Sequence, residues 1–377
     1  MLDLARQYNP IREEILAALA EVLDQRHFIL GQPVTAFERL AAEALGVVEA
    51  IGCASGTDAL WLALAAAGIG QGSVVVTTPF SFFASVSSIV RAGAKPLLAD
   101  IDPVTFNLDP TRVRALLALK QEVPIRAILP VHLYGQCADW AGFTALSTEF
   151  DVKLIEDAAQ AWGARWQNQP AGTLGQAAAF SFYPTKNLSA AGDAGLVTTN
   201  DPELAERVRM LRQHGMRQRY HHDEIGWNAR MDGFQGAVLQ VNLRHLPARA
   251  VLRNQAAERY HQLFRAAGLA ESGTYPERGV ILPRTAPGNH VVWHQYVIRA
   301  PRRDALRAHL TANQIGSEIY YPIPLHMQKA LAYLGYSEGD FPEAERATRE
   351  VLALPIFPEI RSDEQQRVVN AIAEFLS

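Results

Sequence analysis

The run FSFYPTKNL, residues 180–188, places strand-forming side chains directly before a proline and a single lysine, Lys186. Aromatic and apolar residues of this kind favour a buried strand, whereas Pro184 ends the pairing because it has no N–H to donate. A segment of small residues, AAGDAG at 190–195, leads into a second apolar run, LVTT at 196–199. We therefore expect Lys186 at the end of a buried strand, between two strands of one sheet.

Two interpretations of Lys186 fit this stretch. In the first, the lysine is structural, and its ammonium group extends to solvent at the edge of a sheet. In the second, apolar neighbours desolvate the amine and favour its neutral form, which can form a Schiff base with an aldehyde cofactor. The stretch alone favours the structural role, so the choice depends on the rest of the chain.

Length and composition indicate an ordinary globular protein of two domains. The chain has 377 residues, of which 49% are hydrophobic and 20% charged, and its formal net charge is −4. This charge argues against a dominant basic surface for nucleic acid. Two cysteines, Cys53 and Cys137, form no C-x-x-C pair, which indicates a reducing compartment and no zinc or other metal site. With no signal peptide and no apolar stretch long enough for a bilayer, the predicted location is the cytoplasm, without membrane contact.

Short apolar runs alternate with helical patterns over much of the chain. This alternation predicts an α/β fold with a mostly parallel central sheet between layers of helices. The expected strands are 74–77, 95–99, 126–131 and 152–156, and the expected helices among them are 57–67, 83–92 and 139–149.

A long helical pattern from 232 to about 265 leads out of this layer. Beyond it we expect a strand at 291–299, a helix at 302–313, a strand near 317–321 and two closing helices. The change of pattern predicts a large domain over residues 1–250, with an N-terminal helix, and a smaller C-terminal α+β domain over residues 251–377.

Residues 55–57, Ser-Gly-Thr, stand at the start of an apolar helix. Ser55 or Thr57 can cap that helix, which is the commoner role of such residues. Gly56 also lets a ligand approach the backbone, and the free N–H groups of a helix N-terminus attract anions. The segment is therefore either a plain helix cap or an anion site.

Two further candidates lie at predicted strand ends. Asp157 follows the strand 152–156, and ligands bind at the carboxyl ends of strands in parallel α/β sheets. A carboxylate there can keep a pyridine nitrogen protonated, which makes pyridoxal phosphate an electron sink, or it can cap a helix. Phe82 follows the strand 74–77 and either stacks on a flat ring or packs in the core.

Two later segments are less specific. GWNARM at 226–231 indicates only a loop before the long helix. The basic run from Arg207 to His222 is typical of a solvated face, and it could also receive a phosphorylated substrate. Together, however, the segments supply an anion cradle, a ring-stacking aromatic, a partner for a pyridine nitrogen and a lysine. This combination predicts a pyridoxal 5'-phosphate site and favours the chemical role of Lys186.

From SGTDAL at 55–60 to YPIPLH at 321–326, the chain resembles the DegT/DnrJ/StrS sugar aminotransferases, which are fold-type I pyridoxal-phosphate enzymes. The most specific parts of the resemblance are EDAAQA at 156–161 and SFYPTKNL at 181–188. It implies the fold-type I architecture and a cofactor that alternates between pyridoxal and pyridoxamine 5'-phosphate.

The resemblance also implies roles for individual residues. Lys186 forms the Schiff base and moves the proton, and Asp157 pairs with the pyridine nitrogen. Gln160 contacts the hydroxyl face of the ring, and Phe82 stacks on it. Asn228 reaches the cofactor phosphate of the neighbouring subunit, which implies a homodimer with shared active sites. The other implied phosphate ligands are Ser55, Gly56, Thr57 and Ser181.

The implied reaction transfers an amino group from glutamate to a nucleotide-linked keto-sugar in amino-sugar and polysaccharide biosynthesis. Many members read His-Tyr-Pro where this chain has Tyr320-Tyr321-Pro322, and the latter resembles members that aminate a 3-keto rather than a 4-keto sugar. The nucleotide and the sugar stay open. The implied substrate residues are Tyr183, Arg219, Tyr220, Tyr321 and His326, of which His326 could instead be a packed loop histidine.

Two alternatives share the scaffold. A sugar dehydratase of this type carries a histidine in place of the lysine, so Lys186 argues against it. A non-catalytic regulator would have a decayed site or a basic surface, and the sequence has neither. One departure from the family pattern is Ala194, where the family often has glycine. Its methyl group fits if the backbone is not in a glycine-only conformation, and otherwise it crowds the pocket floor.

Overall fold

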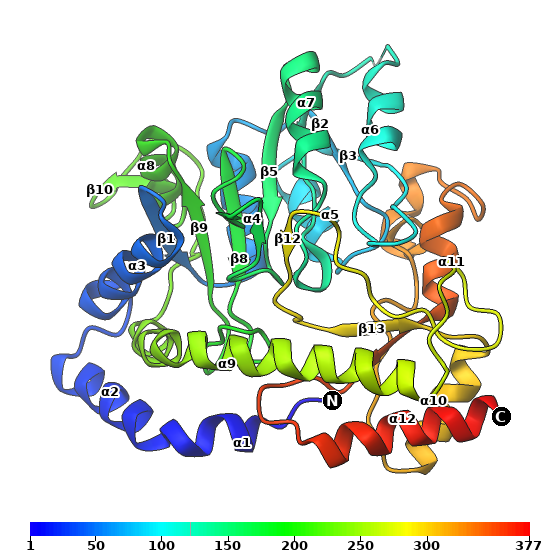
Figure 1. The fold of residues 1–377 in the computed structure, drawn as a ribbon. Helices are drawn as coiled ribbons and strands as arrows, with labels where there is room; N and C mark the ends of the chain where they lie inside the picture. The colour runs from blue at the N-terminus through cyan, green and yellow to red at the C-terminus, as the bar shows by residue number, and fades with distance from the viewer. Residues whose placement is uncertain (121) are drawn as a thin grey trace.

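The computed structural model describes residues 1–120 and 122–377, and its centre is a seven-stranded sheet (Figure 1). All neighbouring strands are parallel except at β9, which runs against the strand on each side of it. The predicted mostly parallel sheet is therefore confirmed. In spatial order the strands are β1 (Glu49–Cys53), β9 (Gly195–Thr199), β8 (Ala177–Ser181), β5 (Lys153–Asp157), β4 (Ile125–Ile128), β2 (Val74–Thr77) and β3 (Lys95–Leu98).

Helices cover both faces of this sheet, because successive strand residues point to opposite sides. Ile155 packs on the face covered by α4 (Gly56–Ala66), α5 (Ala84–Arg91) and α8 (Pro202–Leu211). Leu154 packs on the other face, with apolar side chains of α6 (Pro110–Leu117) and α7 (Trp140–Phe150). Further along that second face, Phe180 lies in a cluster with side chains of α3 (Gly31–Leu45). The predicted layered arrangement is confirmed.

The longest helix, α9 (Gly233–Ala266), connects the sheet layer to the C-terminal part of the chain (Figure 1). Its first half packs against α2 (Arg12–Gln25) and α3, and its second half contacts α12 (Ser362–Leu376). The short first helix α1 (Leu4–Tyr8) also contacts α12, since Arg6 donates to both carboxylate oxygens of Glu364 at 2.7 and 2.9 Å. The two ends of the chain are thus held together.

The C-terminal part has its own apolar core. β13 (Tyr296–Arg299) and β14 (Val351–Leu354) form an antiparallel pair, surrounded by α10 (Arg303–Ala312), α11 (Pro342–Glu350) and α12. The predicted division near residue 250 falls inside α9, and we retain it as a proposal about domains.

The remaining elements are short. The hairpin of β10 (Met216–Gln218) and β11 (His221–His222) projects beyond α8 (Figure 1). A small three-stranded sheet contains β12 (Asn289–His290), β6 (Arg165–Trp166) and β7 (Gln169–Pro170). Within the described ranges, no helix combines the length and apolarity needed to cross a membrane. Short 3₁₀ turns occupy Asn9–Ile11, Leu133–Gly135, Leu325–Met327 and Lys329–Leu334.

Two predicted strands of the C-terminal part are wrong in extent. The strand expected at 291–299 begins only at Tyr296, because the backbone before it pairs with other loops: Val292 donates to the Gly135 carbonyl at 3.0 Å. The strand expected near 317–321 is a single bridge between Glu318 and Ala353. Beyond that bridge the Tyr320 carbonyl accepts a hydrogen bond from the Tyr134 hydroxyl, so the chain leaves the sheet.

Candidate active site

Loops at the carboxyl edge of the parallel strands enclose a pocket of about 740 Å³. β5 and β8 both end at this pocket, the N-terminus of α4 forms one wall, and residues 318–321 form another. The sequence-predicted residues that line it are Ser55, Gly56, Thr57, Phe82, Asp157, Gln160, Ser181, Tyr183, Lys186 and Tyr321.

Lys186 reaches the pocket from a turn just beyond β8. Its N–H donates to the Tyr183 carbonyl at 2.8 Å, which closes the turn. The Lys186 side chain is partly exposed within the pocket, but the surrounding walls desolvate its amine. This desolvation lowers its pKa from 10.5 to about 8, although the negative charge of Asp157 acts in the opposite direction. A part of the Lys186 population is therefore neutral near physiological pH, as a nucleophile or general base requires.

Asp157 is the last residue of β5 and is only 3% exposed. Its Oδ2 accepts a hydrogen bond from the Ser85 hydroxyl at 2.7 Å, and its Oδ1 accepts one from the Ala159 N–H at 3.2 Å. Burial raises the pKa of Asp157, and these two hydrogen bonds oppose the rise. A carboxylate has about four acceptor positions, so Asp157 retains acceptor capacity on its pocket side.

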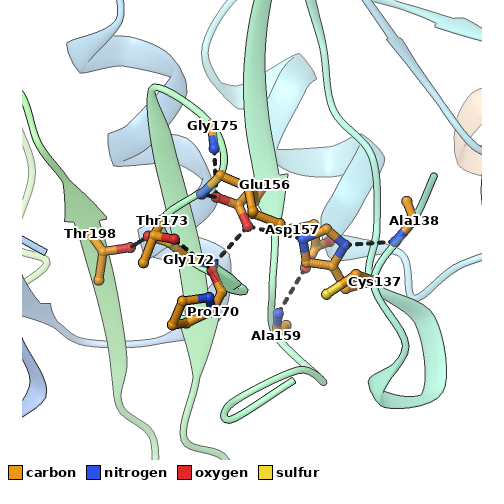
Figure 2. A network of polar contacts seen from close by, with 12 residues as sticks. Cys137, Ala138, Glu156, Asp157, Ala159, Pro170, Gly172, Thr173, Gly175 and Thr198 are labelled. Atoms are coloured by element: carbon orange, nitrogen blue, oxygen red, sulfur yellow. Dashed lines mark hydrogen bonds and ion pairs between the residues drawn. The ribbon is translucent and has the colours of Figure 1, made fainter. Parts of the chain in front are cut away.

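Glu156, the preceding residue of β5, points to the other side of the strand and is surrounded by donors (Figure 2). His132 Nδ1 accepts from the Ala138 N–H at 3.1 Å, so its Nε2 carries the proton and donates to Glu156 at 3.0 Å. Glu156 is thus a fixed buried anion that fastens the loop after β7 to β5. Its remaining donors are the N–H groups of Gly172, Leu174 and Gly175, at 2.7 to 2.8 Å.

The N-terminus of α4 forms a tight cradle against β8 and β9. Ser55 caps the helix, since its hydroxyl oxygen accepts from the Asp58 N–H at 3.0 Å. A Cβ on Gly56 would lie 2.5 Å from the Ser181 Cβ, and a Cβ on Gly195 would lie 2.2 Å from the Ser55 carbonyl oxygen. The two glycines therefore let the strands approach the free N–H groups of α4, which makes the cradle suitable for a phosphate.

Ala194, the departure from the family pattern, does not crowd the pocket. Its side chain is buried in the apolar cluster that contains Phe182. The position in this segment that has no room for a methyl group is the following one, Gly195.

Gln160 and Tyr321 connect the pocket floor to the C-terminal wall. Gln160 Oε1 accepts from the Tyr134 N–H at 2.7 Å, and its Nε2 donates to the Tyr321 hydroxyl at 3.0 Å. Burial raises the pKa of Tyr321, so its phenol stays protonated. The Phe82 ring lies 6.4 Å from the Tyr321 ring and is 59% exposed, which leaves it accessible for stacking.

Three sequence-predicted residues lie on the surface outside the pocket of this chain. Asn228 is exposed in the loop before α9, where its Oδ1 accepts from Arg230 Nε at 3.0 Å. Arg219 and Tyr220 occupy the β10–β11 hairpin, with the guanidinium 5.0 Å above the ring. None of the three lines the pocket of this chain.

The expectation that His326 lines the sugar pocket does not match its position. The side chain is 2% exposed, its Nε2 lies 3.1 Å from a Glu345 oxygen, and its ring packs against Phe341. His326 is the packed loop histidine of the alternative interpretation. The turn at 325–327 directs it into the C-terminal core.

Several pocket residues were missed from the sequence. Ser81 and Ser85 are one helical turn apart beside Phe82, and this i, i+4 spacing was a usable signal. His294 gave no signal, because it was assigned to a regular strand. It is buried, and burial and the charge of Lys186 hold its pKa well below 6.5, so the ring is neutral. The other polar residues that were missed are Thr185, Asp193, Gln295, Glu318 and Tyr320.

These groups fit pyridoxal phosphate. The N-terminus of α4 lines the pocket through Ser55, Gly56 and Thr57, and the absence of a Cβ on Gly56 lets Ser181 line it beside them. Asp157 offers a buried acceptor to a ring nitrogen, and Lys186 offers a neutral amine. Phe82 supplies an open aromatic face.

Comparisons with known proteins agree with this geometry. Residues 9–373 match the model of the DegT/DnrJ/EryC1/StrS aminotransferase family. The chain is 47% identical to a "pleiotropic regulatory protein" of Geobacillus stearothermophilus, over 100% of this chain and 98% of that protein. It is 40% identical to a UDP-N-acetyl-3-dehydro-alpha-D-glucosamine 3-aminotransferase of Acidithiobacillus ferrooxidans (100% and 97%). It is 42% identical to a dTDP-3-amino-3,4,6-trideoxy-alpha-D-glucose transaminase of Streptomyces venezuelae (99% and 95%).

A solved structure extends the similarity to the fold. The crystal structure of DesV from Streptomyces venezuelae, in complex with a ketimine intermediate, superposes with a TM-score of 0.93 at 41% identity. The alignment covers 100% of this chain and 97% of that one.

The buried environment of Lys186 predicts an unusual titration. In the protein without cofactor, we expect the Lys186 amine to titrate near pH 8 instead of 10.5. The measurement is the pH dependence of its acylation rate by a small reagent, followed on the Lys186 peptide by mass spectrometry. Because the charge of Asp157 raises the pKa of Lys186, Asp157→Asn should shift the titration to still lower pH. An ordinary lysine titration, or an upward shift in Asp157→Asn, would contradict the account.

Proposed function

The chain belongs to the DegT/DnrJ/EryC1/StrS aminotransferase family, and we propose that within this family it transfers an amino group from glutamate to a nucleotide-linked 3-keto sugar. It is a pyridoxal-phosphate-dependent aminotransferase. The proposal rests on one observation: Lys186, Asp157 and the N-terminus of α4 line the same pocket. The relatives named above for 3-amino sugars are similar over nearly the whole chain, which supports the choice of substrate.

The pocket wall supports the same substrate class. Residues 319–321 line the pocket, and Tyr321 is tied to its floor through Gln160. We propose that the keto-sugar binds beside the tyrosine pair, which distinguishes this chain from members with His-Tyr-Pro. We propose a role in amino-sugar biosynthesis. We also propose a cytoplasmic location, which rests on the two buried free cysteines.

Each pocket residue then has a defined task. When bound, pyridoxal phosphate supplies an electron sink for the carbon that exchanges its amino group. Lys186, neutral for part of the cycle, accepts the proton from that carbon and returns it. Asp157 holds a proton on the ring nitrogen, and Gln160 orients the opposite, hydroxyl-bearing side of the ring. The proposed phosphate ligands are Ser55, Gly56, Thr57 and Ser181, and Phe82 stacks on the ring.

The charge of the pocket supports a shared active site. Among the described residues of its wall, Lys186 is the single lysine or arginine, whereas Asp157, Asp193 and Glu318 are acidic. The nucleotide diphosphate and the carboxylates of glutamate need cations. We propose that the β10–β11 hairpin of the partner subunit supplies one through Arg219, beside Tyr220.

The surface around Asn228 supports a homodimer. Ile225 is 86% exposed and Trp227 is 50% exposed, a few residues after the exposed Tyr220 of the hairpin in the sequence. Grouped exposed apolar side chains are typical of an interface. We propose that this surface meets a second copy of the chain, which brings Asn228 of the partner subunit to the cofactor phosphate.

A substrate panel tests the proposed reaction. Purified protein with pyridoxal phosphate should aminate UDP- and dTDP-linked 3-keto sugars with glutamate, and 4-keto isomers should react more slowly. The readout is formation of 2-oxoglutarate and of the amino sugar by mass spectrometry. Preference for 4-keto sugars would contradict the assignment of the 3-position, and no turnover with any nucleotide sugar would contradict the proposed substrate class.

Mixed dimers test the sharing of sites. Lys186→Ala and Asn228→Ala proteins should each lose most activity, because each homodimer carries its lesion in both sites. In a mixed dimer, one site contains both substituted residues. The other site contains an intact Lys186 and an intact Asn228 of the partner subunit. Reassembly of equal amounts should therefore restore about a quarter of wild-type activity, since about half of the dimers are mixed and each has one good site.

The control for reassembly is the same procedure applied to each variant alone. If the mixture shows only the average of the two separate activities, the site is not shared between subunits. A chain that remains monomeric at assay concentration would contradict the dimer itself.

A further inference from the structure

Two serines connect Asp157 to the loop that carries Phe82. The Ser85 hydroxyl oxygen lies 2.7 Å from Asp157 Oδ2 and 2.9 Å from the Ser81 hydroxyl oxygen. Ser81 and Ser85 are 3% and 1% exposed, and both line the pocket. The three residues form a continuous buried chain of hydrogen bonds at the start of α5.

The direction of this chain follows from the groups themselves. An ionised carboxylate only accepts hydrogen bonds, so the Ser85 hydroxyl donates its one proton to Asp157. Ser85 then accepts from the Ser81 hydroxyl. Both O–H dipoles therefore point their positive ends toward Oδ2, and a hydrogen bond to an ionised group is about twice as strong as one between neutral groups.

Asp157 needs such support because its surroundings favour the neutral acid. Burial is the largest influence on its pKa and raises it. The Ser85 hydrogen bond is the largest opposing influence, ahead of the Ala159 N–H. Among the other groups around it, Lys186 beyond β8 and His132 beyond β4 contribute less.

Two further groups near Asp157 do not stabilise its charge. Tyr321, on the C-terminal wall, is held in its protonated form by burial. Glu156, on the opposite side of β5, is itself an anion, and its carboxylate accepts hydrogen bonds from three N–H groups and from His132 (Figure 2). The two neighbouring carboxylates therefore differ: Glu156 has a full set of donors, whereas Asp157 depends on Ser85 and keeps an acceptor position free for a ligand.

We propose that Ser85, oriented by Ser81, is a positioning residue that keeps Asp157 ionised inside the pocket, so that Asp157 can hold a proton on the ring nitrogen of the cofactor. The step toward the cofactor rests on the proposed function, whereas the charge state of Asp157 does not. A protonated Asp157 would present a donor to the nitrogen and could not stabilise a protonated ring.

The first test uses the protein without cofactor. With ¹³C-carboxyl-labelled aspartate, the Asp157 signal is identified by its absence in Asp157→Asn and is titrated by NMR. In Ser85→Ala, the pKa of Asp157 should rise by about one unit or more. Ser85→Thr, which keeps the hydroxyl, should restore the wild-type titration. Ser85→Cys keeps the packing but donates weakly, so it should shift the pKa in the same direction as alanine.

Ser88→Ala is the matched control. Ser88 is a buried serine of the same helix, but its hydroxyl donates to the Thr57 carbonyl at 3.2 Å instead of to a carboxylate. Its replacement should leave the Asp157 titration unchanged. An unchanged titration in Ser85→Ala and Ser85→Cys would overturn the proposed role of Ser85.

The second test adds pyridoxal phosphate labelled with ¹⁵N in the ring. In Ser85→Ala, the nitrogen signal should move toward that of the unprotonated ring, and the dissociation constant of the cofactor should rise about tenfold. If the pKa of Asp157 rises without cofactor but the ring nitrogen does not respond, the assignment of Asp157 to the cofactor is wrong. If only the first test fails, the proposed function still holds, but Ser85 has no part in it.

Discussion

Burial of Lys186 and Asp157 at one edge of the sheet is the constraint on which the rest of the site depends. Burial shifts both groups toward their neutral forms, because a charge is costly in a poorly solvated pocket. For Lys186 this shift is useful, since its amine must be neutral to act as a nucleophile or base. For Asp157 it is harmful, since a neutral acid cannot hold a proton on a ring nitrogen. The structure gives Asp157 two hydrogen-bond donors, Ser85 and the Ala159 N–H, and leaves Lys186 subject to desolvation.

The fold supplies this environment through the ends of its strands. β5 delivers Asp157, and β8 delivers Ser181 and then Lys186. The loop after β2 delivers Ser81 and Phe82, and the start of α5 delivers Ser85. Parallel strands end at the same edge, so residues far apart in the sequence meet in one pocket. Gly195 on β9 lets the N-terminus of α4 approach closely enough to complete a phosphate cradle. The C-terminal part closes the pocket with Tyr320 and Tyr321.

Much of this arrangement could be predicted from the sequence, because its signals are local. The alternating strands and helices, the lysine after FSFYP and the acid after the strand 152–156 each follow from a short pattern. The C-terminal wall could not be predicted in the same way. Residues 291–295 and 317–321 have the composition of strands, but their backbones form hydrogen bonds with the loops around Gly135 and Tyr134. Contacts of this kind produce no periodic pattern in the sequence.

Residues whose role depends on contact with another side chain also could not be identified from the sequence. Ser85 looks like an ordinary helical serine until Asp157 is placed beside it. No role was expected for His294, whereas His326 was expected to line the sugar pocket or to pack in a loop. His294 lines the pocket, whereas His326 packs into the C-terminal core beside Glu345. Which histidine faces the pocket depends on the turns at 292–295 and 325–327, and the sequence does not specify their directions.

The most direct test of the account asks which lysine carries the cofactor. The protein is incubated with pyridoxal phosphate, reduced with borohydride, digested, and examined by mass spectrometry. We expect one modified peptide, containing Lys186, at about one label per chain, and no such label in Lys186→Ala. Labelling at another lysine, or no stable label in the wild-type protein, would show that burial does not prepare Lys186 for this chemistry.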